Sequence, residues 1–93
     1  MNKQEETQLF ETAIQKWGAN AQMDMVVEEC AELIKAINKF KRNVSSDTIK
    51  ELCGEIADVE IMCYQARIML KKGELIDDIK EQKLERLKSR LNS

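Results

Sequence analysis

Residues 26–40, VVEECAELIKAINKF, decide the fold because their apolar side chains return at the spacing of one helix face. The stripe consists of Val26, Cys30, Leu33, Ile37 and Phe40. Cations gather at residues 39–42, where they favour the negative end of a helix dipole. The stretch therefore predicts an amphipathic helix that follows a short connection at residues 18–21 and ends near residue 42.

Two further helices are predicted on either side of this one. An apolar stripe indicates a helix over residues 3–17, which Gly18 can end in the left-handed conformation. A polar connector at residues 43–47 precedes a third helix, whose first free amides can be capped by Ser46 or Asp47. The two long helices should therefore form an antiparallel hairpin.

The third helix carries its apolar face over residues 49–70, and Gly73 is expected to stop it. A more charged fourth helix follows over residues 76–91. The chain has no Pro and only three Gly, and 34% of it is charged. These features predict one all-α domain of four helices over residues 1–93.

Chain length and charge indicate the partners. A chain of 93 residues can bury only a small core, which gives marginal stability. We therefore expect a helical bundle completed by a homodimer or homotetramer. A net charge of −2 gives no reason to expect a nucleic acid polymer, and no apolar run is long enough to span a membrane. Cys30, Cys53 and Cys63 fall at apolar positions, which favours reduced, buried thiols and a cytoplasmic location.

Two acidic pairs stand beside the apolar stripes, Glu29-x-x-Glu32 on the second helix and Glu55-x-x-Asp58 on the third. At about 100° per residue, Glu29 and Glu55 fall on the apolar faces and the other two at their borders. Both pairs lie about 10 to 16 residues from the connector, so a hairpin brings them level. We expect one cluster of four carboxylates.

Such a cluster would repel itself and resist desolvation unless a cation binds. Mg²⁺ prefers oxygen ligands and is commonly shared between carboxylates and substrate phosphates. The chain has no His, which argues against a di-iron or an ordinary zinc site. The cluster therefore predicts Mg²⁺ binding, and the alternative is neutralisation by Lys or Arg from a partner helix.

The motif EExxE followed by ExxD resembles the signature of the MazG-like all-α nucleoside triphosphate pyrophosphohydrolases. Here it reads Glu28-Glu29-Cys30-Ala31-Glu32 and then Glu55-Ile56-Ala57-Asp58. The resemblance implies hydrolysis of a nucleoside triphosphate to monophosphate and pyrophosphate by attack of water on the α-phosphorus. It implies that Mg²⁺ is held by Glu29, Glu32, Glu55 and Asp58, and Glu28 or a metal-bound carboxylate such as Glu32 is the candidate acceptor of the water's proton.

Related chains also carry Lys, then Asn at i+4 and Arg at i+7, on the last helix, where they meet the substrate phosphates. Lys83 and Arg90 match this motif, whereas Leu87 stands at the Asn position; a solvated helix face would look the same. Trp17 can stack on a base, although an aromatic at this position of an apolar stripe is more often a core residue. The alternatives are a phosphoribosyl-ATP pyrophosphohydrolase-like enzyme and a non-catalytic helical interaction or nucleotide-sensing module.

Overall fold

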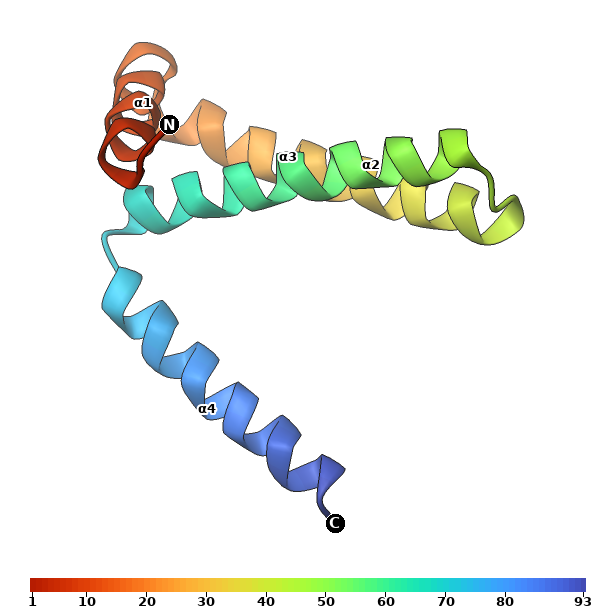
Figure 1. Ribbon diagram of the computed structural model, residues 1–93. Coiled ribbons are helices and arrows are strands. Elements are labelled where there is room, and N and C mark those ends of the chain that lie inside the picture. The colour runs from red at the N-terminus through yellow and green to blue at the C-terminus, as the bar shows by residue number, and fades with distance from the viewer.

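A computed structural model covers all 93 residues and contains four α-helices and no strand (Figure 1). The helices are α1 (Lys3–Trp17), α2 (Ala19–Arg42), α3 (Ser46–Leu70) and α4 (Gly73–Leu91). The prediction of an all-α chain of four helices is therefore confirmed. None of the four has the combination of length and apolar character that a membrane crossing requires.

The centre of the structure is the antiparallel hairpin of α2 and α3, with α1 lying across its open end (Figure 1). Near the connector the hairpin is closed by an ion pair of 3.3 Å between Lys39 Nζ and Glu51 Oε1. At the open end α1 packs on α3 through Phe10 and Tyr64, whose ring centroids are 5.5 Å apart. α4 contacts only α3, and its C-terminal end lies away from the hairpin (Figure 1).

The joint between α1 and α2 is one residue, Gly18, rather than the predicted stretch 18–21. Its φ of 90° is positive, as expected of a glycine stop. Its ψ of 149° lies outside the left-handed helical region that we predicted. Only glycine adopts this conformation readily, because a Cβ atom would clash with the backbone. The chain therefore turns sharply and starts α2 at once.

The cap of α3 is Ser45, so the predicted caps Ser46 and Asp47 are wrong by one and two positions. The Ser45 hydroxyl accepts a hydrogen bond from the Thr48 amide at 3.1 Å, and the Thr48 hydroxyl accepts one from the Ser45 amide at 2.9 Å. This reciprocal pair satisfies two amides that a helix start leaves free. It also buries Thr48.

The joint between α3 and α4 also differs from the prediction, because Gly73 begins α4 instead of ending α3. The left-handed residue that ends α3 is Lys71, with a φ of 55°. Arg67 spans the joint and donates hydrogen bonds to the Gly73 carbonyl at 3.2 Å and to Asp77 at 2.8 Å. One side chain therefore bridges the end of α3 and the first turn of α4.

The single chain is more extended and more exposed than a closed domain of its size. Its radius of gyration is 16.1 Å, against about 12 Å expected for 93 residues. Its accessible surface is 7477 Å², against about 5500 Å² for a compact monomer of this mass. Ala36 is the only apolar residue that is buried.

Exposed apolar side chains occur on all four helices, and those of α3 include a regular stripe. Ile49, Ile56, Cys63 and Leu70 recur every seven residues and are all exposed, as is Cys53 beside them. We call these five residues the α3 stripe. The expectation of buried thiols is therefore wrong for Cys53 and Cys63 in the single chain, and Cys30 is only half-buried. The reason is that the apolar face of α3 is wider than the strip that α2 covers.

Candidate metal centre

Three carboxylates meet between α2 and α3, near the middle of the hairpin. Glu29 comes from α2, and Glu55 and Asp58 come from successive turns of α3. Each offers one oxygen, and these oxygens lie within 4.8 Å of one another. The acidic residues lie on the facing sides of the two helices and at similar distances from the connector. These two conditions bring their carboxylates together.

The burial of these groups follows their helix positions. Glu29 and Glu55 are half-buried, whereas Asp58 and Glu32 are exposed, as the angles along each helix predict. The Oε2 atom of Glu55 is shielded from solvent and has no hydrogen-bond partner. A carboxylate oxygen in that position is costly unless something positively charged or a donor meets it.

The pKa of Glu29 and the ion pairs of the chain show that the negative charge of the cluster is not neutralised. Desolvation raises the pKa of the Glu29 carboxyl, and the nearby charges of Asp58, Glu55, Glu28 and Glu32 raise it further. The two ion pairs of the chain, Lys39 with Glu51 and Arg67 with Asp77, both lie outside the cluster. No cation of the chain therefore offsets these negative charges through an ion pair.

The donor set fits a hard divalent cation. All three ligand atoms are carboxylate oxygens, and Glu55, one of the three residues, also has a shielded Oε2 atom that lacks any donor. Oxygen-only sites of this kind suit Mg²⁺ or Ca²⁺ rather than zinc or copper. With three protein ligands on one side, such a site leaves positions for water or phosphate oxygens on the other.

The remaining predicted site residues lie outside the group of three. Glu28 and Glu32 are exposed on α2, and neither carboxylate joins the close cluster, although both charges act on Glu29. Lys83 and Arg90 are exposed on α4, which makes no contact with α2. Within one chain the basic and acidic predicted residues are therefore not brought together.

A cavity of about 570 Å³ lies next to the cluster, toward the open end of the hairpin. It is lined by Trp17, Ala21, Gln22, Met25, Met62 and Gln65. Trp17 is 59% exposed, so it is not the core residue that its place in the apolar stripe favoured. Met25 precedes Glu29 by one turn and Met62 follows Asp58 by one turn. The cavity therefore lies about one helical turn from the carboxylates along both helices.

Sequence reasoning did not select Gln22 and Gln65 as site residues, yet both are buried in this cavity. For Gln22 a signal existed, because it stands four residues before Val26 and continues the apolar stripe of α2. For Gln65 a signal also existed, because it stands three residues after Met62 and seven after Asp58, on the same side of α3.

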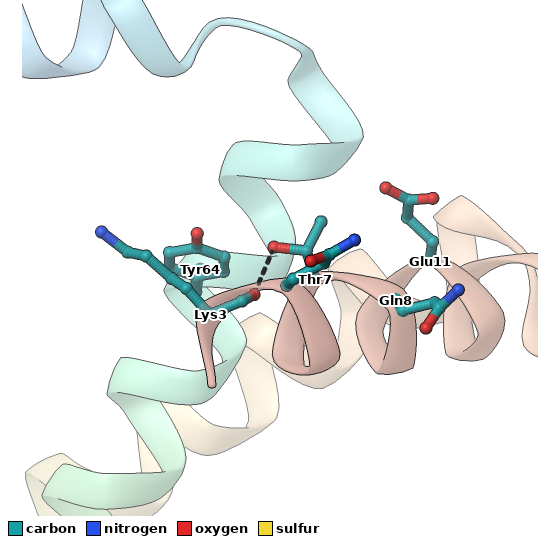
Figure 2. Close-up of a pocket in the computed structure, with 6 residues that line it drawn as sticks. Lys3, Thr7, Gln8, Glu11 and Tyr64 are labelled. Atoms are coloured by element: carbon teal, nitrogen blue, oxygen red, sulfur yellow. Dashed lines mark hydrogen bonds between the residues drawn. The ribbon is translucent and has the colours of Figure 1, made fainter. Parts of the chain in front are cut away.

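A second hollow, of about 420 Å³, lies along α1 where α1 meets Tyr64 of α3, and it is lined by Lys3, Gln4, Thr7, Gln8, Glu11 and Tyr64 (Figure 2). Its polar groups are spread along the helix surface. The Thr7 hydroxyl donates to the Lys3 carbonyl at 3.0 Å, within its own helix (Figure 2). This hollow lacks converging groups like those of the carboxylate cluster.

No protein-family model, curated protein or solved structure matches this chain.

Proposed function

We propose that this protein is an Mg²⁺-dependent nucleoside triphosphate pyrophosphohydrolase that converts a ribo- or deoxyribonucleoside triphosphate and water into the monophosphate and pyrophosphate. The observation that carries the proposal is the convergence of Glu29, Glu55 and Asp58 with no offsetting cation. The resemblance of the EExxE and ExxD motifs to the MazG-like enzymes supports the same reaction.

In this proposal Glu29, Glu55 and Asp58 hold the metal and Glu32 borders it. Bound Mg²⁺ supplies positive charge that offsets the charge of the triphosphate in an acidic site. Glu28, exposed beside Glu29, accepts the proton of the attacking water. The water oxygen bonds to the α-phosphorus, and the bond from that phosphorus to the bridging oxygen breaks, so that pyrophosphate leaves.

Self-association is part of the proposal. The accessible surface exceeds that of a compact monomer by about 1900 Å², which is more than the roughly 800 Å² that each partner buries in a standard interface. The exposed α3 stripe offers an apolar surface for a second copy. We propose a homodimer or homotetramer in which α4 of one copy presents Lys83 and Arg90 to the substrate phosphates in another.

The test is to incubate the purified protein with a panel of nucleoside triphosphates and Mg²⁺ and to measure pyrophosphate. Glu55→Gln should lower kcat/KM by about 100-fold or more, because a lost metal ligand is worth several kcal/mol. Glu60→Gln makes the same change on the exposed side of α3 and should leave kcat/KM unchanged. No pyrophosphate from any substrate would refute the proposal.

A further inference from the structure

The cavity beside the metal centre contains a polar atom that the fold itself does not use. Gln65 is only 4% exposed, and its Oε1 atom has no hydrogen-bond partner. Gln22, 6% exposed, lines the same cavity. A buried carbonyl without a donor destabilises a fold, because water satisfied that atom in the unfolded chain. Folding alone therefore gives no reason to keep an amide at position 65.

The other walls of the cavity are apolar or aromatic. Trp17 presents its indole from the end of α1, and Met25 and Met62 face the cavity from the two hairpin helices. An aromatic face with polarisable thioethers suits a flat, weakly polar ring. A site with apolar walls and a few placed polar groups is the usual form of a small-molecule pocket.

The position of the cavity relative to the carboxylates limits the ligand further. Gln22 precedes Glu29 by seven residues, and Gln65 follows Asp58 by seven. Two helical turns separate them by about 10 Å along the helix axis. One sugar with its first phosphate bridges a gap of this kind between a base and a metal-bound phosphate chain.

We propose that the cavity binds the base of the nucleotide and that Gln65 is a specificity-determining residue, whose carbonyl accepts a hydrogen bond from an exocyclic amino group of cytosine or adenine. This inference rests on the proposed function. It concerns the base of the substrate, which the metal centre does not contact. Gln22 bounds the same edge of the base, and Trp17 stacks on its ring.

Trp17 is the only tryptophan, so its fluorescence reports on the cavity directly. The experiment titrates cytidine and adenosine monophosphates into the protein in EDTA, without metal or turnover. Each is paired with its counterpart that lacks the amino group, the pyrimidin-2-one and purine ribonucleotides. In the wild type, loss of the amino group should weaken binding by about 5- to 100-fold, because it leaves the Gln65 carbonyl unsatisfied.

Variants at position 65 test whether the preference for an amino base depends on the Gln65 carbonyl oxygen. Gln65→Leu removes the acceptor and should bind both members of each pair equally, whereas Gln65→Glu keeps an acceptor and should retain the preference for the amino base. Gln82→Leu, on exposed α4, is the matched control and should behave as the wild type. Circular dichroism checks that each variant is helical, and the Gln65→Glu result stands even if Gln65→Leu fails to fold.

Equal binding of amino and amino-less nucleotides by the wild type overturns the inference. So does Trp17 emission that changes with protein concentration but not with nucleotide, since a second copy would then fill the cavity. Hydrolysis of triphosphates without base preference would overturn the base assignment and leave the proposed function standing. Selective binding of monophosphates without hydrolysis of any triphosphate would support the base pocket and refute the proposed function.

Discussion

Replacement of Ile56 by Glu should separate the copies of this protein. Ile56 lies at the centre of the α3 stripe and is 43% exposed in the single chain. Burial of a whole isoleucine side chain is worth about 1.5 to 3 kcal/mol, so covering the exposed part contributes about 1 kcal/mol per chain. In a two-fold dimer the contact occurs twice, which gives about 2 kcal/mol. The dissociation constant should therefore rise by at least about 30-fold, before any cost of the new charge.

Sedimentation equilibrium over a range of concentrations measures this constant directly. Val44→Glu is the control, because Val44 is a 67% exposed aliphatic residue in the connector and receives the same charge. It should leave association unchanged. Circular dichroism confirms that both variants remain helical. A wild type that stays monomeric at every concentration, or an Ile56→Glu variant that associates as tightly as the wild type, would refute the reasoning.

Four further predictions concern the carboxylate site, the α3 stripe and the joint between α3 and α4. The folded state binds a proton at Glu29 more tightly than the unfolded state, so stability falls as pH rises above about 4.3. Glu29→Gln should therefore melt higher than the wild type at pH 7 in EDTA, with the gap closing near pH 4; an equal or lower midpoint at pH 7 would contradict this. Mg²⁺ should raise the wild-type midpoint more than that of Glu29→Gln, as thermal melting with and without the ion will show. Cys63 should react slowly with a thiol reagent in the associated wild type and quickly in Ile56→Glu, and equal rates would argue against burial of the stripe. Arg67→Met should speed amide hydrogen exchange in α4, because the 2.8 Å bond to Asp77 is lost; unchanged exchange would mean that the bond does not hold the joint.

Sequence periodicity was sufficient to predict the four helices and the position of Glu29 and Glu55 on the inner side of the cluster. Glu29 and Glu55 are half-buried because the same angular position that places them on an apolar face places them at the helix contact. The cap of α3 was missed because Ser45, Ser46 and Asp47 are all good capping residues, and the reciprocal bond with Thr48 decides among them.

The direction of α4 was beyond sequence reasoning. It depends on contacts between helices, such as the reach of Arg67 across the joint, and a helical repeat contains no information on those. The family resemblance rests on short motifs, EExxE, ExxD and the basic positions Lys83 and Arg90, and it stays a prediction.

The hairpin also determines the order in which the site can assemble. Contacts near the connector, such as Lys39 with Glu51, join residues only 12 positions apart and cost little chain entropy to form. Folding that propagates from the connector reaches the three carboxylates before it reaches Trp17 and the cavity. The mutual repulsion of the carboxylates then opposes the pairing of α2 with α3 at that point. A divalent ion that relieves this repulsion would accelerate folding as well as stabilise the folded state.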